Sequence, residues 1–385
     1  MENVPNTTEE YKQNYLDKVK AQYLRALVSI KLSEGLQLHG DFNKLPTSID
    51  GYDLEEPDLP LSSDSISTVF AQHERNKEDL SQKIQAKVEG IGEISMQVSI
   101  LDLDQNPDKD MYVVMGGALS PALRTLGAPL AALGNRVMMV PHILNHSVEP
   151  VGCDHHTFTE KYYEYDQQNG AYTPDGKFIS EILDILRRNG QINGNLHLVG
   201  HSAGGGVWMR VAHDIAKNYP ELEEQLENVL LIDSIGTYLP KEYRGFKKFL
   251  NIGKLIGGFG IEASRALPFI DRDEWLLNIG DAETQPWNNK DWLKSVTRCM
   301  SPILNDVSPH VENKISIILA EDGRVISKDK VYECVEQLNQ EREEKGQTNI
   351  AVMEVWGGHN SPVKRGMEIA SRIQHLVEDR PYPDI

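Results

Sequence analysis

A serine between two glycines stands where an apolar run of the sequence ends. Residues 196–199 read Leu-His-Leu-Val, and Gly-His-Ser-Ala-Gly follows. An apolar strand that leads through G-x-S-x-G into a helix predicts a very tight turn, because a β-carbon at Gly200 or Gly204 would collide with neighbouring backbone. Such a turn holds the Ser202 hydroxyl clear of the sheet at a helix N-terminus, where the helix dipole favours negative charge. Ser202 is therefore the candidate nucleophile; the alternative is a glycine-rich turn with an incidental serine.

A serine hydroxyl is a weak nucleophile and needs a base. Residues 352–360 form an apolar run that breaks at two glycines and delivers His359 into a loop before a helix. This position favours His359 as the general base over the alternative of an ordinary loop histidine. His201 lies inside the tight turn and cannot easily face the neighbouring hydroxyl. His155 and His156 lie in a tyrosine-rich segment without a third ligand at diagnostic spacing, so we expect no metal site.

A carboxylate must hold the imidazole tautomer and stabilise the imidazolium. The apolar run 315–319 leads into two acids, and Asp322 is favoured because its Asp-x-x-Val context continues toward a helix. Glu321 is the first alternative. Asp233, which follows the apolar run 229–232, is the second.

A developing oxyanion needs N–H donors aimed at it. The first expected donor is the backbone N–H of Ala203, directly after the nucleophile. The second is expected from the loop 116–120, which follows an apolar strand and contains two glycines that let backbone approach a substrate closely. Ala118 is the preferred second donor, with Gly117 close behind.

These residues need a scaffold that brings distant strand ends together. From residue 94 onward, short β-rich runs alternate with helical stretches, which predicts an α/β fold with a doubly wound, mostly parallel sheet. Catalytic residues of such a sheet lie at the carboxyl ends of its strands. The predicted strands are 96–103, 112–115, 136–140, 196–199, 229–232, 315–319 and 350–355. The predicted helices are 121–133, 177–188, 206–218, 328–345 and 363–377.

The chain divides into four predicted parts. A helical N-terminal extension covers residues 1–92, with a first helix along an apolar face from Tyr11 to Val28 and a second over 67–88. The core follows in two parts, 93–235 and 303–385. Between them, residues 236–302 interrupt the alternation and form a predicted cap.

Composition limits the classes of function. The chain has 385 residues, of which 39% are hydrophobic and 25% charged, so it can bury a core. Its formal net charge of -19 disfavours nucleic acid as a partner. Three widely spaced cysteines argue against a disulfide scaffold or a zinc knuckle. Without a visible signal peptide or membrane span, we expect a soluble, cytoplasmic protein.

The order Ser202, Asp322, His359 resembles that of the α/β-hydrolase superfamily, in its lipase and esterase branch. The resemblance spans about residues 96–377. It implies hydrolysis of a carboxylic ester through an acyl-enzyme, with no cofactor and with residues 236–302 as a cap over the active site. The chain departs from many members in having Gly-Gly instead of His-Gly before the oxyanion residue, which puts the second donor in doubt.

The predicted cap is apolar and glycine-rich between Phe246 and Ile261, which suits a hydrophobic, lipid-like substrate and transient membrane contact without insertion. Packing of the cap onto the core is an equal alternative. The same triad could serve a thioesterase, an amidase or an acyltransferase. A function of another class, a non-catalytic binding module that retains the fold, also stays open. The sequence does not indicate the oligomeric state.

Overall fold

A computed structural model describes residues 48–49, 52–53, 82–102, 106–117, 126–144, 148–266, 297–355, 358–359 and 361–378 of the chain. The strands are β1 (Ser48–Ile49), β2 (Tyr52–Asp53), β3 (Gln82–Val88), β4 (Gly92–Leu101), β5 (Met111–Met115), β6 (Arg136–Met139), β7 (Val148–Val151), β8 (Leu196–His201), β9 (Leu226–Ile232), β10 (Lys314–Ala320) and β11 (Ala351–Val355). The helices are α3 (Ala128–Ala132), α4 (His155–Asn169), α5 (Thr173–Arg188), α6 (Ala203–Asn218), α7 (Pro220–Glu223), α8 (Gly245–Ala266), α11 (Ile303–Val307), α12 (Lys328–Glu344) and α13 (Ser361–Val377), with 3-10 turns η2 (Pro240–Glu242) and η4 (Ser308–His310).

One sheet organises the described residues, in the order β11-β10-β9-β8-β5-β6-β4-β3. The six strands from β11 to β6 are parallel, and β4 and β3 are antiparallel to their neighbours. β7 pairs with β4 outside this path. The interior strands β5 and β8 are buried at every position, as parallel strands covered on both faces are. The prediction of a doubly wound, mostly parallel sheet is confirmed.

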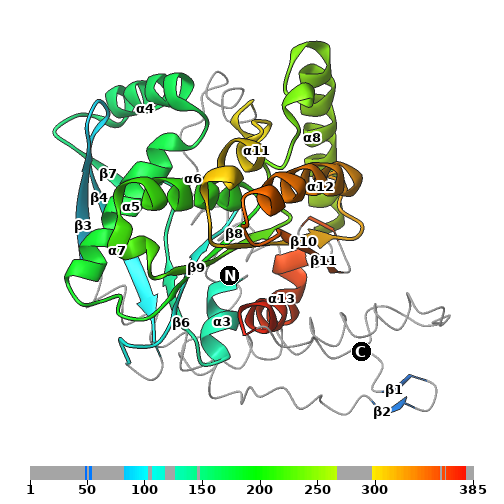
Figure 1. Cartoon of the computed structure of the whole chain (residues 1–385), viewed down its shortest axis with the longest axis horizontal. Helices are drawn as coiled ribbons and strands as arrows, with labels where there is room; N and C mark the ends of the chain where they lie inside the picture. Colours follow the sequence, from blue (N-terminus) through cyan, green and yellow to red (C-terminus); the bar gives the residue numbers. More distant parts are fainter. Residues whose placement is uncertain are drawn as a thin grey trace, which may run out of the picture.

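Helices cover both faces of the sheet (Figure 1). On one face, α3 and α13 bury Leu130 and Ile373 against the strands. On the other face, α5, α6 and α12 bury a larger core that includes Phe178 and Trp208. None of the helices in the part of the chain that the structure describes has the length and hydropathy needed to cross a bilayer.

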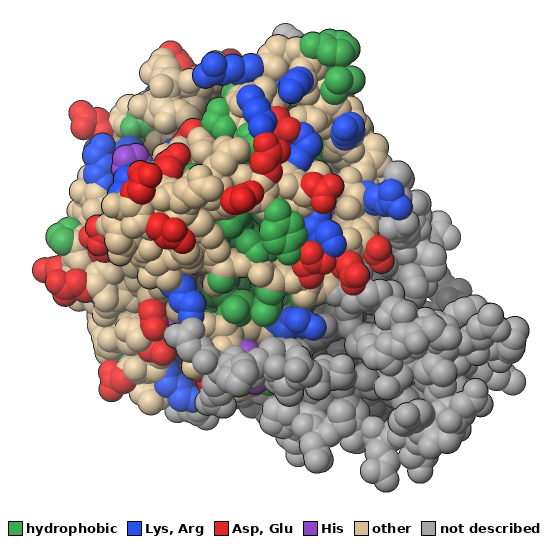
Figure 2. Space-filling view, turned by 45° about the vertical axis from the view of Figure 1, so that its right-hand side comes forward, with side chains coloured by type: hydrophobic (Ala, Val, Ile, Leu, Met, Phe, Trp, Pro, Cys, Tyr) green, Lys and Arg blue, Asp and Glu red, His purple; other side chains and the backbone are tan. Residues whose placement is uncertain are grey.

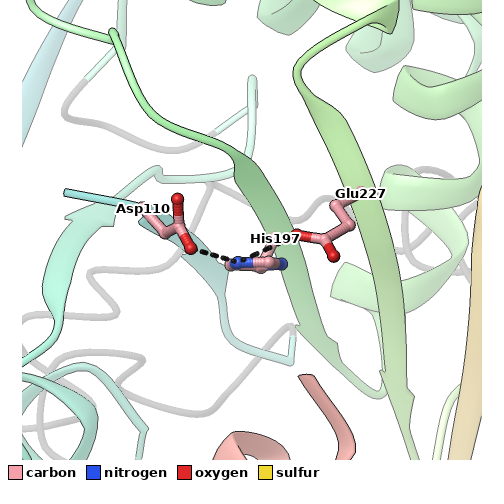
Figure 3. Close-up of side chains that lie close together, drawn as sticks. All are labelled: Asp110, His197 and Glu227. Atoms are coloured by element: carbon pink, nitrogen blue, oxygen red, sulfur yellow. Dashed lines mark ion pairs between the residues drawn. The ribbon is translucent and has the colours of Figure 1, made fainter. Parts of the chain in front are cut away.

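The register between β8 and β9 has one irregularity. Leu196 pairs with Leu226 and His197 with Asn228, so Glu227 is an extra residue in β9. Such a bulge redirects a side chain. Figure 3 shows the result: Glu227 and Asp110, which directly precedes β5, flank His197 on β8.

The end of the predicted second helix is a strand. The prediction placed helix over 67–88, but residues 82–88 form β3. Ile84, Ala86 and Val88 are buried and alternate with exposed residues, which is the period of a half-buried strand. The predicted first helix lies outside the described residues.

The predicted cap is helical where it is described. After η2, the 22-residue helix α8 begins at Gly245. Leu255 is buried, and a β-carbon on Gly258 would overlap the carbonyl oxygen of Arg324, so this side of α8 lies against the loop after β10. Phe246 and Phe249 are 78% and 77% exposed. Hydrophobic and basic side chains lie side by side at the top of the molecule in Figure 2, where α8 projects in Figure 1.

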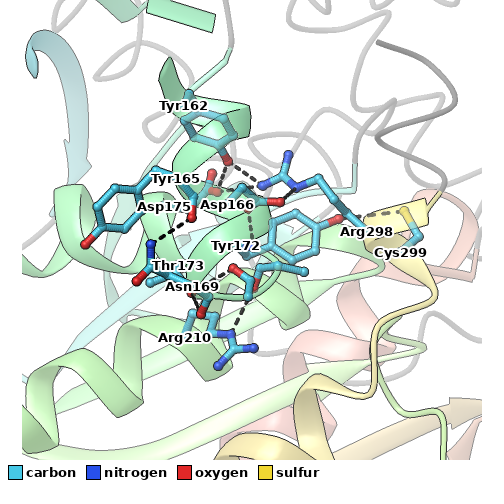
Figure 4. Close-up of polar contacts among 12 residues, drawn as sticks. Tyr162, Tyr165, Asp166, Asn169, Tyr172, Thr173, Asp175, Arg210, Arg298 and Cys299 are labelled. Atoms are coloured by element: carbon cyan, nitrogen blue, oxygen red, sulfur yellow. Dashed lines mark hydrogen bonds and ion pairs between the residues drawn. The ribbon is translucent and has the colours of Figure 1, made fainter. Parts of the chain in front are cut away.

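A buried ionic network joins the tyrosine-rich segment to the far end of the cap region (Figure 4). Arg298 lies 3.1 Å from Asp166 at the end of α4 and 2.9 Å from Asp175 at the start of α5. The hydroxyl of Tyr162 also contacts Asp175 and Arg298. Tyr172, whose ring stacks on the guanidinium, completes the cluster. Two segments more than a hundred residues apart are therefore held together by charge.

Candidate active site

Ser202 occupies a strained turn between β8 and α6. Its φ of 54° and ψ of -118° lie in a region that residues with a β-carbon rarely adopt. The tightness of the turn explains the flanking glycines. A β-carbon on Gly200 would lie 2.5 Å from the nitrogen of Gly205, and one on Gly204 would lie 2.6 Å from the carbonyl oxygen of Met115. The turn therefore has the geometry that the sequence predicted.

Backbone and side-chain hydrogen bonds hold this conformation. The N–H of Ser202 donates to the carbonyl oxygen of Ile232 at 3.0 Å, which ties the turn to the end of β9. The carbonyl oxygen of Ser202 accepts from the Ser234 hydroxyl at 2.9 Å and from the N–H of Ile235 at 3.1 Å. A β-carbon on Gly205 would overlap the Ser234 hydroxyl. The residues after β9 thus fix the position of the nucleophile.

His359 is the base that the structure brings to Ser202. Its Nε2 lies 2.9 Å from Ser202 Oγ, and its Nδ1 lies 2.5 Å from Oδ2 of Asp233. The His359 residue is 2% exposed and Asp233 is 1% exposed, so water does not compete for these contacts. The arrangement allows a proton to pass from Oγ to Nε2 while the carboxylate stabilises the imidazolium.

The carboxylate in this relay is Asp233, and the preference for Asp322 is corrected. Asp233 has a φ of 38°, which turns the chain sharply at the end of β9. Its N–H donates to the carbonyl oxygen of Ile318 at 2.7 Å, and its Oδ1 accepts from the N–H of Ala320 at 3.2 Å. Glu321 lies one residue and Asp322 two residues beyond the end of β10, and both residues are exposed. Asp233 was the second alternative at the sequence level.

The structure describes two of the three candidate oxyanion donors. Ala203 is the first residue of α6, so no carbonyl of its own helix lies in reach of its N–H. A β-carbon on Gly117 would lie 3.0 Å from Ser202 Cβ and 3.5 Å from Oγ, so this backbone lies directly beside the nucleophile. Ala118 lies outside the described residues. Ala203 and Gly117 thus lie beside Ser202, and the oxyanion roles of Ala203, Gly117 and Ala118 stay predictions.

His142 fixes the oxyanion loop and was missed at the sequence level. Its Nε2 lies 3.0 Å from the carbonyl oxygen of Gly116. Because a carbonyl oxygen can only accept, His142 donates through Nε2–H, and burial is the main cause that lowers the pKa of its ring. The available signal was its place just after the β6 strand, at the edge of the sheet that carries Ser202.

His201 contacts the backbone of His359. It is 1% exposed, and its Nε2 donates to the carbonyl oxygen of His359 at 2.8 Å. Burial, followed by the neighbouring His359, lowers the pKa of His201 to about 3. The centroid of its ring lies 5.0 Å from that of the His359 ring. His155 and His156, by contrast, lie exposed at the start of α4.

Comparisons with known proteins give likenesses of fold. No protein-family model matches the sequence, and no curated protein sequence is similar to it. Among solved structures, a thioesterase domain from the curacin biosynthetic pathway is 13% identical with a TM-score of 0.46 and covers 76% of this chain and 99% of its own. An enol-lactonase from Burkholderia xenovorans is 12% identical with a TM-score of 0.47, covering 77% and 100%. A putative aryl esterase from Burkholderia cenocepacia is 11% identical with a TM-score of 0.48, covering 78% and 100%.

Proposed function

We propose that this chain is a member of the α/β-hydrolase superfamily and a serine hydrolase that cleaves a carboxylic ester. The observation that carries the proposal is the line of contacts from Ser202 Oγ to His359 Nε2, 2.9 Å, and from His359 Nδ1 to Asp233 Oδ2, 2.5 Å. A hydroxyl with a buried imidazole and carboxylate behind it is activated for attack on an acyl carbon. The strained turn presents that hydroxyl at the N-terminus of α6.

The reaction runs through an acyl-enzyme. Ser202 Oγ attacks the ester carbonyl as His359 Nε2 takes its proton, and the backbone N–H groups of Ala203 and of Gly117 or Ala118 hold the oxyanion. His359 then protonates the leaving alcohol. A water molecule, deprotonated by the same imidazole, hydrolyses the acyl-enzyme and restores Ser202. Asp233 orients the ring and stabilises the imidazolium throughout.

The substrate we favour has a hydrophobic acyl group. The support comes from α8, whose inner side lies against the loop after β10 and whose outer side exposes Phe246, Phe249 and Leu250. These apolar side chains are exposed in a row on one helix, near the edge of the sheet where Ser202 lies. Such a row suits an acyl chain or a lipid surface. The same triad would also serve a thioester, an amide or transfer to an alcohol, so the leaving group is left open.

Labelling with a fluorophosphonate probe tests the proposal, because the probe bonds only to an activated serine. Wild-type protein should be labelled at Ser202 with one equivalent, and Ser202→Ala should not be labelled. Ser327→Ala, which removes an exposed serine, is the matched control and should label like wild type. Turnover of p-nitrophenyl esters should fall by about 10⁴- to 10⁶-fold in Ser202→Ala. An unlabelled wild-type protein with normal folding would indicate a non-catalytic binding module instead.

If labelling succeeds, a series of p-nitrophenyl esters of increasing chain length defines the acyl group. We expect kcat/KM to rise from acetyl to medium-length acyl esters. Matched thioester and amide substrates of the preferred acyl group then separate the alternative leaving groups. A preference for acetyl over every longer ester would contradict the hydrophobic acyl group without contradicting the triad.

A further inference from the structure

We propose that Asp110, His197 and Glu227 form a binding site for a divalent transition-metal cation, with Zn²⁺ the best fit. The three side chains offer one imidazole nitrogen and two carboxylate oxygens, all within 4.8 Å of one another. They lie at the amino ends of β5, β8 and β9, whereas Ser202 follows the carboxyl end of β8. The length of that strand, on the order of 15 Å, separates the two sites. The proposal is therefore independent of the proposed function.

The strongest observation is a buried nitrogen without a hydrogen-bond partner. His197 has no exposed side-chain surface, and its Nε2 forms no hydrogen bond with any residue that the structure describes. That atom faces Oδ2 of Asp110 at 3.7 Å and Oε2 of Glu227 at 3.9 Å. Both distances are too long for a hydrogen bond. Buried polar nitrogens are normally satisfied, so this arrangement leaves room for an atom between the three groups.

The distances suit a metal ion. Zinc binds imidazole nitrogen and carboxylate oxygen at about 2.0–2.2 Å, which places two tetrahedral ligands roughly 3.4 Å apart. The observed separations of 3.7 and 3.9 Å need to shorten by only a few tenths of an ångström. The carboxylate side chains are 48% and 49% exposed, so they can make that movement and solvent can supply a fourth ligand.

The charges also favour a cation. Two carboxylates converge on one imidazole, and no lysine or arginine that the structure describes forms an ion pair with Asp110 or Glu227. A divalent ion would balance both negative charges. An imidazole ligand favours zinc and similar transition metals over magnesium or calcium, which prefer oxygen ligands alone.

Neighbouring amides support the ligands. Asp110 Oδ1 accepts from the N–H of Asn195 at 2.9 Å, and Glu227 Oε2 accepts from the Asn195 side chain at 3.1 Å. The side-chain amide of Asn228 lies 3.1 Å from Nδ1 of His197, while its own Oδ1 has no hydrogen-bond partner among the described residues. Turning that amide over brings Oδ1 to Nδ1–H, and the Nε2 lone pair is then free for the metal. One bound ion and one amide rotation would supply partners for the Nε2 of His197 and the Oδ1 of Asn228.

The test uses the full chain, stripped with a chelator and titrated with Zn²⁺ against a chromophoric competitor. Wild-type protein should bind one equivalent of Zn²⁺ at this site, and its melting temperature should rise by a few degrees. Asp110→Asn combined with Glu227→Gln keeps the Asn195 hydrogen bonds but removes both charges, and should weaken binding by about tenfold or more. Asp108→Asn, an exposed carboxylate two residues away, is the matched control and should bind like wild type. Mg²⁺ should produce no comparable rise in melting temperature.

X-ray absorption at the zinc edge provides a second measurement if a variant folds poorly. Wild-type protein with one equivalent of Zn²⁺ should show a single imidazole ligand, and replacement of exposed His155 and His156 by alanine should leave that signal unchanged. The absence of stoichiometric binding would overturn the proposal and leave a bridging water as the occupant. Equal binding in the double variant and in wild type would also overturn it, because the ion would then sit on other histidines.

Discussion

Oδ2 of Asp233 lies 2.5 Å from Nδ1 of His359, and this contact joins the end of β9 to the loop after β11. We predict that Asp233→Asn lowers kcat by about 10⁴-fold, because an amide no longer holds the ring in the productive tautomer. Asp322→Asn is the matched control and should retain nearly wild-type kcat, since its side chain is exposed. Steady-state kinetics on a p-nitrophenyl ester decide the matter. A larger loss in Asp322→Asn would instead assign the acid to the turn directly after β10.

Gly117→Ala should lower kcat at least about tenfold while the protein remains folded. Its β-carbon would lie 3.0 Å from Ser202 Cβ, so either the oxyanion loop or the nucleophile must shift. Gly253→Ala in α8, where a β-carbon meets nothing within 4 Å, controls for the loss of a glycine. Kinetics together with circular dichroism separate a catalytic effect from misfolding. Equal kcat in the two variants would show that Gly117 does not need its close approach.

Substitutions at two adjacent glycines test how α8 packs against the loop after β10. Gly258→Ala should displace the helix from the loop after β10, because its β-carbon would overlap the carbonyl oxygen of Arg324. Gly257→Ala meets open space and should be neutral or slightly stabilising, since alanine favours a helix by about 1 kcal/mol over glycine. We expect the chain-length profile of kcat/KM to change in Gly258→Ala alone. Identical profiles in both variants would remove α8 from the acyl pocket.

The buried His201 makes the protein sensitive to acid. Its folded-state pKa of about 3 lies below the ordinary value of 6.5, so the unfolded chain takes up a proton that the folded protein does not. The stability that the neutral His201 contributes is fully present above about pH 6.5. As the pH falls toward about 3, the free energy of unfolding decreases by up to about 1.4 kcal/mol per pH unit. His201→Gln keeps a donor for the His359 carbonyl but cannot titrate. Urea unfolding at several pH values should give a shallower pH slope for this variant than for His155→Gln, an exposed control. Equal slopes would contradict the prediction.

Arg298→Met should destabilise the fold strongly. The substitution would leave Asp166 and Asp175 buried without their cation, and removal of one partner from a buried ion pair costs about 3–5 kcal/mol. Arg188→Met, whose side chain is 55% exposed, removes the ion pairs with Glu181 and Asp184 and should cost less than about 1 kcal/mol. Chemical denaturation measures both. Similar costs would show that methionine packs into the cluster as well as the charged network does.

The sequence predicted that Ser202 and His359 act together, and the structure places them 2.9 Å apart, but the acid ranked first, Asp322, is not the carboxylate that contacts His359. Ser202 and His359 carry local signals, because glycines at fixed positions are needed for the turns that present them. Asp233 and Asp322 both follow apolar strands, and the Asp-x-x-Val context that favoured Asp322 does not indicate which carboxylate reaches His359. The difference is how the chain leaves each strand: Asp233 turns sharply at a φ of 38°, whereas Asp322 lies farther along an exposed turn. A backbone angle of this kind depends on tertiary contacts that sequence patterns do not contain.

The β3 strand could have been predicted. Residues 82–88 alternate polar and apolar side chains, with Ile84, Ala86 and Val88 on the buried face. Lysine and glutamine in the same stretch favour helices and concealed the period of two. The metal-site candidates could not be found this way. Asp110, His197 and Glu227 are far apart in the sequence, and only the strand order and the bulge in β9 bring them together.

The nucleophile and its base are 157 residues apart in the chain, so the order of synthesis matters. A chain made from its N-terminus carries Ser202 and Asp233 long before His359 exists, and folding during translation proceeds from the same end. In the proposed mechanism, Ser202 has no base and cannot be acylated until β11 and the loop after it have left the ribosome and β11 has docked on β10. Reactivity of Ser202 would therefore indicate that β11 is in place, and a chain that is still being synthesised would not react with substrate.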